Sequence, residues 1–595
     1  MTNDVAGGEF LNRPIPEDTV FIPEEFTKEH KAIAKTVKEF VSGEIQSRGD
    51  EIEHVNNDLS RTLMKRAGEI GLLAADIPEE YDGMALDKIS SLIISDVLGQ
   101  GAGSFTITEL NHTGIGTLPL AFFGTESQKQ QYLPGLSSGQ LIGAFGLTEP
   151  DAGSDALNAR TTAALSDDGG HYVLNGSKCF ITNAGFADLI FTFAKVDGKA
   201  FTAFIVEFKA DGISTDAEEV KMGMKGTSTR TVNFNNVHVP VGNVLGEVGR
   251  GHVVALNALN MGRFKVGAVC VGNARGTFSE AVKYANQRVQ FNQPISEFGL
   301  IKEKIGDMAI GLFAGESMMY RTAGMIDKKI KAAGEVPAAD VGRVTAGALE
   351  EYLIECSIMK IYGSEVQGMV ADQSVQIFGG YGYIYENPAE LAYRNSRINR
   401  IWEGTNEINR ATIAGTLLKR VAKDRLPLAI DPETLLKELV ILPPISEDRP
   451  DDLDTQKEML ATAKTVARYM IGTANQTCNG NLNEHQELAG ILSDMVIEIY
   501  AAESALLRAA KLMSAGAGSQ AVAVQMVKVL SVRLFDRMLS LVWRALPALM
   551  NGTDCLQRQA LLGRCLTPPP IDTIALIRRI ADQCIKKKGV PLKAI

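Results

Sequence analysis

The feature that most constrains the fold of this chain is a change of hydrophobic period in its middle. Before about residue 140 and after about residue 256, apolar residues recur at helical spacing. Between them, residues 141–255 alternate polar and apolar positions, are rich in Phe, Thr and Val, and contain Asn-Gly and Asp-Gly pairs typical of turns. We therefore predict a multidomain α+β protein in which a β domain separates helical domains.

The length of the chain predicts several domains. Its 595 residues are too many for one core, and a prior of roughly 100–200 residues per domain suggests about three or four. Prolines cluster between 426 and 450, and a helical period returns after them. We expect an N-terminal extension (1–25), a helical domain (26–140), the β domain (141–255), a helical bundle (256–425), a linker (426–450) and a C-terminal helical domain (451–595).

Composition excludes several classes of function. The net charge of −11, with both signs interspersed, argues against a nucleic-acid surface. The seven cysteines form no C-x-x-C pair and the seven histidines no H-x-x-x-H pattern, so we expect neither a disulfide framework nor a metal site.

Targeting signals are also missing. The N-terminus lacks a basic region followed by an apolar run, and no apolar run approaches the ~18–20 residues of a membrane span. We expect a soluble bacterial cytoplasmic chain, or a processed mitochondrial one if the source is eukaryotic. The basic, apolar tail IALIRRIADQCIKKKGVPLKAI is expected to pack on its domain, with weak membrane-surface contact as the alternative.

Three segments could hold a ligand. GAFGLTEPDAGSDA (143–156) exposes backbone N–H groups and a hydroxyl at a domain junction, which suits a polar ring edge or a phosphate; the alternative is a plain turn. KCFITNAG (178–185) places an aromatic ring and a hydroxyl at a strand end, or is simply a hairpin. QIFGGYGY (376–383) ends a helical run with glycines that could be a C-cap. None has the glycine pattern of a Rossmann or Walker site.

The stretch RINRIWEGTNEINR (397–410) holds one carboxylate between a tryptophan and a glycine. Gly404 and Thr405 break a helical run, and Thr405 is placed to N-cap the next helix, so Glu403 lies in a connector. Taken alone, an exposed ion pair between Glu403 and Arg400, contributing ~0–1 kcal/mol, is the simplest interpretation.

In this order, the segments resemble those of the acyl-CoA dehydrogenase flavoprotein family. GLTEPDAGSD and YRNSRINRIWEGTNEINR are similar to its two signature regions, and KCFITNAG, KMGMKGTST, NMGRFKVGA, QRVQF and QIFGG to motifs between them. The resemblance covers about residues 26–421 and implies an N-terminal helical domain, a middle β domain and a helical bundle. The extra C-terminal helical domain resembles the very-long-chain branch.

The resemblance implies a reaction and a base. In this family a glutamate removes the α-proton of an acyl-CoA thioester, and the β-hydrogen leaves as hydride to N5 of FAD, giving a trans-2-enoyl-CoA in fatty-acid β-oxidation. Glu403 matches that glutamate. Some branches place the base where this chain has Gly262, which cannot act, so Glu403 has no competitor. Burial against Trp402 should raise its pKa from ~4.3 towards working pH, and its backbone N–H should help to stabilise the enolate.

The remaining site residues are carried over by position. The family's FAD contacts fall on Phe145, Leu147, Thr148 and Ser154; Phe180, Ile181 and Thr182; Arg288, Val289 and Gln290; Gln376, Gly379 and Gly380; and Thr405, Asn406 and Glu407. Substrate contacts fall on Ser154, Asn260, Arg263 and Gly404. The Arg288 and Gln376 groups resemble segments that reach the FAD of a partner subunit, which implies at least a homodimer.

Substrate range and electron acceptor follow from the same resemblance. The C-terminal domain implies a preference for long acyl chains, as does uncharged Asn111, near the point where some medium-chain relatives have an acid. The expected acceptor is an electron-transferring flavoprotein. Two alternatives remain open: an acyl-CoA oxidase, whose reduced flavin reacts with oxygen, and a non-catalytic assembly scaffold with the same fold.

Overall fold

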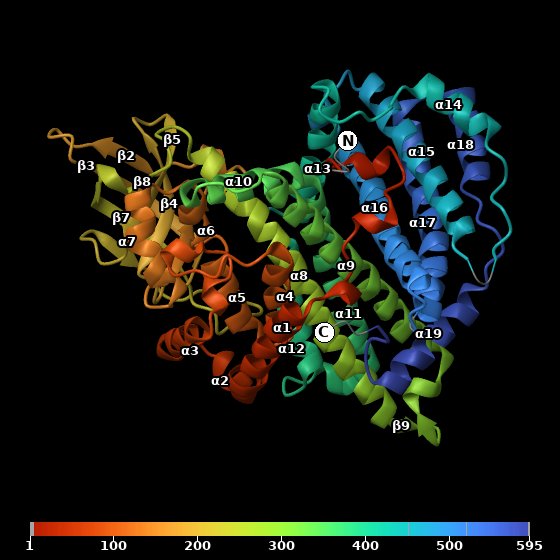
Figure 1. The fold of residues 1–595 in the computed structure, drawn as a ribbon, viewed down its shortest axis with the longest axis horizontal. Coiled ribbons are helices and arrows are strands. Elements are labelled where there is room, and N and C mark those ends of the chain that lie inside the picture. The colour runs from red at the N-terminus through yellow and green to blue at the C-terminus, as the bar shows by residue number, and fades with distance from the viewer. Residues whose placement is uncertain (1–4, 450–451, 519, 593–595) are drawn as a thin grey trace.

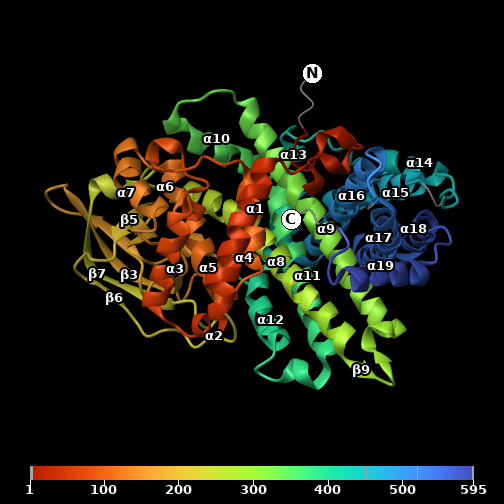
Figure 2. The ribbon, with the colours of Figure 1, turned by 60° about the horizontal axis from the view of Figure 1, so that its bottom comes forward.

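The computed structural model describes residues 5–449, 452–518 and 520–592. Helices, a β domain and a helical bundle follow one another along the chain, and a further helical domain ends it, so the predicted fold class is confirmed (Figure 1). The sheet lies at one end of the molecule and the C-terminal helices at the other, with long helices between them (Figures 1 and 2). Within the described ranges, no helix is both long and apolar enough to cross a membrane.

The N-terminal helices begin at capping side chains. Thr27, Asp87 and Thr125 each accept a hydrogen bond from a backbone N–H in the first turn of the helix that follows. The helices are α1 (Lys28–Phe40), α2 (Gly49–Ile52), α3 (Asn57–Glu69), α4 (Lys88–Gly99), α5 (Gly103–Thr113), α6 (Leu118–Phe123) and α7 (Glu126–Ser137). Every residue of α4 is buried, because α1 covers it on one side and the helical bundle on another.

The β domain is one mixed sheet. Its strands are β1 (Gly143–Gly146), β2 (Thr162–Leu165), β3 (His171–Thr182), β4 (Leu189–Val196), β5 (Ala200–Glu207), β6 (Ile213–Thr215), β7 (Thr229–Pro240) and β8 (Val244–Leu245). The order is β6-β7-β3-β2-β4-β5-β8, and β1 pairs in parallel with β4. The strand β1, which begins one of the candidate segments, is thus fixed to the centre of the sheet.

The two predicted turn pairs behave differently. Asp197 and Gly198 have φ values of 51° and 69° and turn the chain between β4 and β5, as expected. Asn175 and Gly176 make no turn, and the prediction was wrong there. They lie within β3, where the pairing with β7 changes register, and a Cβ on Gly176 would lie 2.4 Å from the Thr161 hydroxyl. This glycine marks a β-bulge under close packing rather than a hairpin.

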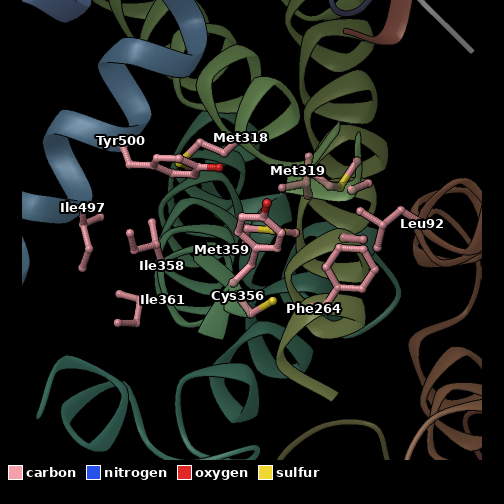
Figure 3. Close-up of a cluster of buried hydrophobic side chains, with 14 of the residues drawn as sticks. Leu92, Phe264, Met318, Met319, Cys356, Ile358, Met359, Ile361, Ile497 and Tyr500 are labelled. Atoms are coloured by element: carbon pink, nitrogen blue, oxygen red, sulfur yellow. The ribbon is translucent and has the colours of Figure 1, made fainter. Parts of the chain in front are cut away.

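The helical bundle is built on two helices that cross at glycines. Its elements are α8 (Gly251–Gln287), a small hairpin of β9 (Val289–Gln290) and β10 (Gln293–Pro294), α9 (Gly299–Ala332), α10 (Ala338–Glu351), α11 (Leu353–Phe378), α12 (Pro388–Ser396) and α13 (Asn406–Ala422). A Cβ on Gly363 of α11 would lie 2.8 Å from the carbonyl oxygen of Gly267 on α8. Figure 3 shows Phe264 of α8, Met319 of α9, Met359 of α11 and Tyr500 of the C-terminal helix α16 (Gln486–Ser514) in one buried cluster.

The C-terminal domain packs directly on this bundle. Its helices are α14 (Pro432–Ile441), α15 (Asp454–Thr477), α16 (Gln486–Ser514), α17 (Gln520–Leu549), α18 (Gly552–Cys565) and α19 (Thr573–Lys587). α14 lies in the segment expected to be a linker, with Pro432 in its first turn, where proline is tolerated. α16 packs on α9 and α13, and α19 packs on α9 and α17, so the basic tail is docked on the protein as expected.

Residues 5–26 form a strap across the joint between the bundle and the C-terminal domain. The backbone N–H of Gly8 donates to Glu355 of α11, and the ammonium of Lys464 on α15 donates to the carbonyl of Arg13. Arg508 of α16 is fully buried and pairs with Glu24 of the strap and Glu316 of α9, both at 2.7 Å. One guanidinium therefore joins three separate parts of the chain.

We predict that Arg508→Met destabilises the protein by about 3–5 kcal/mol, because it removes the buried partner of Glu24 and one of the two guanidinium partners of Glu316, which keeps Arg275. Chemical unfolding should show a lower midpoint for this variant. Arg544→Met, on the exposed face of α17, is the matched control and should leave the midpoint unchanged. Equal midpoints for the two variants would contradict the role assigned to Arg508.

Candidate active site

Glu403 lies in a left-handed turn between the 3-10 helix Arg397–Arg400 and α13. Its φ is 54°, and that of Gly404 is 76°. The Thr405 hydroxyl accepts a hydrogen bond from the backbone N–H of Ile408 at 3.2 Å, which is the predicted N-cap of α13. A residue other than glycine in this conformation costs about 1–3 kcal/mol, so the surroundings must hold the turn in place.

Three side chains hold the turn by its carbonyl oxygens. The Arg263 Nε on α8 donates to the carbonyl of Glu403 at 3.2 Å, and the Lys360 Nζ on α11 donates to that of Gly404 at 2.7 Å. The Asn409 amide donates to the carbonyls of Gly404 at 2.8 Å and Thr405 at 3.1 Å. No described residue accepts a hydrogen bond from the backbone N–H of Glu403. The turn is thus held by its carbonyl oxygens, and the backbone N–H of Glu403 remains available to a ligand.

The Glu403 carboxylate rests on the backbone of α8 at Gly262. A Cβ at Gly262 would lie 2.3 Å from Oε2 and 2.6 Å from Cδ of Glu403, so only glycine leaves room for the carboxylate. The residue as a whole is half-buried, but its Oε2 atom is buried and has no hydrogen-bond partner within the described residues. A buried acceptor without a partner is costly unless a ligand is meant to meet it.

Burial decides the electrostatics of this carboxyl group. Loss of solvent raises the pKa of Glu403 from 4.5 to about 7, although the charges of Arg263 and Lys360 act in the opposite direction. The simplest interpretation of the sequence, an exposed ion pair between Glu403 and Arg400, is wrong. The Arg400 guanidinium packs over Gly368 of α11 instead. A carboxyl group whose pKa lies near neutrality can accept a proton at working pH, as a general base must.

An apolar cluster closes one side of the connector. Trp402 and Ile398 pack against a buried set that is separate from the main core: Ile107, Leu110, Met224, Val266, Val269 and Cys270. Met224 belongs to the loop ahead of β7, and its backbone N–H donates to the Asn395 side chain at 2.6 Å. This loop ends at Thr229, which pairs with Thr182 at the end of β3. The loop from Met224 to Thr229 therefore connects the cluster beside the Glu403 connector to the end of β3, where Thr182 lies.

The β-domain candidates form a second group. The backbone N–H of Cys179 donates to the carbonyl of Thr148 at 2.9 Å, which joins the two predicted flavin segments. Phe180 is 64% exposed with a φ of 59°, and Thr182 is half-buried beside it. Phe145 points instead into the sheet core, edge-on to Phe193 at 5.3 Å, and Leu147 and Ile181 are buried as well. The structure leaves mainly the backbone of those three residues to face a ligand.

The candidates from the bundle tip form a third group. The Arg288 guanidinium lies over the ring of Tyr381, 5.9 Å from its centroid, and Tyr284 stacks on Phe378 at 4.1 Å. These contacts bring Arg288, Val289 and Gln290 beside Gln376, Gly379 and Gly380, all of them exposed. The hairpin that carries Val289 lies far from the β domain in both views (Figures 1 and 2). One chain does not bring all of the predicted residues together.

The other predicted residues differ in what their side chains can reach. Asn260 is buried and accepts a hydrogen bond from Arg263 at 3.1 Å. Asn406 is buried against α11, where it accepts from Lys360 at 2.8 Å and donates to Ser364 at 3.1 Å. Ser154 and Glu407 are exposed.

The sequence analysis missed Lys360 and Asn409. The signal for Lys360 was a single cation in an otherwise apolar turn, SIMKIY; Asn409 carried no separate signal. A cavity of about 420 Å³ lies elsewhere, between Gly71, Met84 and Ser138, and includes none of the predicted residues.

Comparison with known proteins assigns the family. The sequence matches the acyl-CoA dehydrogenase N-terminal domain over residues 27–140, the middle domain over 144–237, and two C-terminal domain families over 249–418 and 462–562. The chain belongs to the acyl-CoA dehydrogenase family. It is 43% identical to a probable acyl-CoA dehydrogenase of Bacillus subtilis (strain 168), over 97% of this chain and 96% of that one.

Two further relatives extend the comparison. The chain is 37% identical to the human mitochondrial very long-chain specific acyl-CoA dehydrogenase, over 66% of its own length and 58% of the relative's. It is also similar to an acyl-CoA dehydrogenase from Bacillus anthracis whose crystal structure was solved in complex with FAD. That match has a TM-score of 0.96 at 42% identity and covers 99% of this chain and 100% of the other.

We predict that Gly262→Ala displaces the Glu403 carboxylate from its buried position, since the new methyl group would lie 2.3 Å from Oε2. The pKa of Glu403 should fall from about 7 towards 4.5, which infrared titration of the protonated carboxyl band can measure against Glu403→Gln. Gly415→Ala in α13, where a Cβ meets nothing within 4 Å, is the control. An unchanged titration in Gly262→Ala would show that the carboxylate does not rest there.

Proposed function

We propose that this chain is an FAD-dependent dehydrogenase that converts long-chain acyl-CoA thioesters to trans-2-enoyl-CoA in fatty-acid β-oxidation, with Glu403 as the base. The observation that carries the proposal is the Glu403 carboxylate in a member of this family: it is buried on Gly262, has no partner for Oε2, and has a pKa near 7. Glu355 of α11 also has a buried Oε2 without a partner and a pKa near 7, but its Oε1 accepts from the backbone N–H of Gly8. Glu403 differs from Glu355 because, within the described residues, no hydrogen bond reaches either of its carboxylate oxygens.

The residues of the second group fit a flavin ring. Phe180 presents an exposed aromatic face from a strained backbone, and the Thr182 hydroxyl and the Thr148 segment lie beside it. An exposed ring of this size is suited to cover a flat cofactor. When bound, FAD would provide the acceptor for the β-hydride at N5. Phe180, Thr148 and Thr182 would hold it on the β-domain side of the site.

The chain's own residues account for the proton transfer. Ionised Glu403 takes the α-proton of the thioester, and the backbone N–H of the same residue donates to the thioester carbonyl oxygen, where negative charge develops. The hydrogen bonds from Arg263, Lys360 and Asn409 to the carbonyls of Glu403 and Gly404 hold the turn, and with it the carboxylate and the backbone N–H of Glu403, in position. The apolar cluster around Trp402 excludes water from that side.

A homodimer would complete the site. The third group of predicted FAD contacts lies at the bundle tip, beside Phe291 and Tyr383, which are 89% and 88% exposed. We propose that this tip reaches the FAD of a second copy of the chain, because large exposed apolar side chains mark association surfaces. An electron-transferring flavoprotein is the proposed electron acceptor.

Long acyl chains are the proposed substrates. The human relative named above is specific for very long chains, and the match to the family extends into the C-terminal domain of this chain over residues 462–562. Asn111 on α5 is uncharged and donates to the carbonyl of Gly143 at 3.3 Å. At this position of α5 the chain therefore has no acidic side chain, although Glu109 is buried on the same helix.

We predict that the purified protein is yellow and that anaerobic palmitoyl-CoA bleaches its flavin absorbance. Glu403→Gln should keep FAD bound but slow bleaching by about 10²–10⁴-fold, because the base is gone while the fold is kept. Glu433→Gln, on the exposed face of α14, is the control and should bleach as the wild type does. Butyryl-CoA should bleach the wild type more slowly than palmitoyl-CoA if long chains are preferred.

Other outcomes would replace this proposal. Colourless protein that cannot bind added FAD would leave the scaffold alternative. Bleaching followed by rapid peroxide formation in air would favour the oxidase. Unaltered bleaching by Glu403→Gln would remove Glu403 from the reaction.

A further inference from the structure

Lys360 is a buried cation directly behind the Glu403 turn. Its side chain on α11 is 0% exposed, and its ammonium donates to the Gly404 carbonyl at 2.7 Å and to the Asn406 side chain at 2.8 Å. Neither acceptor carries a charge. Among the ion pairs of the described residues, none includes Lys360. The fold thus keeps a full positive charge in its interior without a direct counter-ion.

Most other buried lysines of the described residues are treated differently. Five of them form an ion pair with a carboxylate: Lys88 and Lys265 with Asp76, Lys178 with Glu149, Lys464 with Glu503, and Lys528 with Asp448. The sixth, Lys129, donates to the carbonyl of Ala339 and lies over the ring of Tyr81, away from the Glu403 turn. Burial of a charge is expensive unless it is paired, so an unpaired buried lysine requires a reason at its own site. The nearest chemistry is that of Glu403.

The charged and titratable groups around Lys360 come from three helices and the connector. Glu403 faces it from the connector, Arg263 and Cys270 from α8, and Glu407 from the first turn of α13. Cys356, on its own helix, faces Arg263. Burial raises the pKa of Cys270 to about 12, so this thiol stays neutral. Glu407 is exposed to solvent, which leaves Glu403 as the buried carboxylate that the ammonium can influence.

We propose that Lys360 is a positioning residue of the reaction: it holds the Gly404 carbonyl so that the Glu403 carboxylate stays on Gly262, and its charge favours the ionised, proton-accepting form of that carboxylate. The proposal rests on the proposed function of Glu403. Asn409 shares the first task, since its amide also donates to the Gly404 carbonyl. It cannot share the second, because it is neutral.

The direction of the electrostatic effect follows from the geometry. Burial favours protonated Glu403, and the positive charges of Lys360 and Arg263 oppose it. Burial also lowers the pKa of Lys360, to about 8. Because this value is still above neutral pH, the ammonium remains mostly charged at pH 7. Removal of the Lys360 charge should therefore raise the pKa of Glu403, and the pH at which the base becomes active should rise with it.

The test compares Lys360→Met, which removes charge and donors, and Lys360→Gln, which keeps an amide donor, with Asn409→Ala, which removes only a neutral donor. The first measurement is infrared titration of the Glu403 carboxyl band in each FAD-loaded variant, with the same variant carrying Glu403→Gln as reference. The second is the pH dependence of anaerobic flavin reduction by palmitoyl-CoA at low concentration.

We expect the Glu403 titration to move upward by about one pH unit in both Lys360 variants and to stay in place in Asn409→Ala. Flavin reduction at pH 7 should slow about ten-fold or more in Lys360→Met. It should slow in Asn409→Ala as well, but with an unmoved pH profile, because that variant loosens the turn without changing the charge.

Two results would overturn the proposal. Glu403 could titrate at the same pH in Lys360→Met as in the wild type, or Asn409→Ala could shift it as far as the Lys360 variants do. The infrared titration needs no substrate, so it tests Lys360 even if palmitoyl-CoA fails to bleach the wild type. That failure would overturn only the proposed function.

Discussion

The contact between the Glu403 carboxylate and the bare backbone of Gly262 is the constraint on which the site depends. It requires α8 to approach the connector closely, and the crossing of α8 and α11 at Gly267 and Gly363 brings both helices into range. It also requires Glu403 to remain in a left-handed conformation, which donors from both helices and from α13 enforce. The position of the Glu403 carboxylate thus depends on how α8, α11 and α13 pack together.

Much of this architecture could be predicted from the sequence, because period and capping are local signals. The β block, the N-cap at Thr405 and the connector position of Glu403 follow from residues within a few positions of one another. The turn expected at Asn175-Gly176 failed because Thr161, immediately before the neighbouring strand β2, packs on that glycine, where the pairing of β3 with β7 changes register. Lys360 could not be assigned, since its partner lies 44 positions away. Likewise, only the packed sheet shows that Phe145 points inward.

The predicted cofactor contacts lie in separate parts of the molecule. The β domain and the bundle tip are separated by the long helices of the bundle, against which the Glu403 connector packs (Figures 1 and 2). On the opposite side of these helices, the strap of residues 5–26 and the pairs made by Arg508 anchor the C-terminal domain to α9. Such anchoring holds the C-terminal domain against the helices behind the site and leaves the bundle tip exposed.

The most direct test of the account is the pH dependence of anaerobic flavin reduction by a limiting concentration of palmitoyl-CoA. At low substrate concentration the rate reports the ionisation of the free protein. Burial raises the pKa of Glu403 to about 7, so the base is ionised only above that pH. The account predicts a rate that rises through a single ionisation near pH 7. A rate that stays constant down to pH 5 would contradict it, because the carboxyl group would then titrate like one exposed to water.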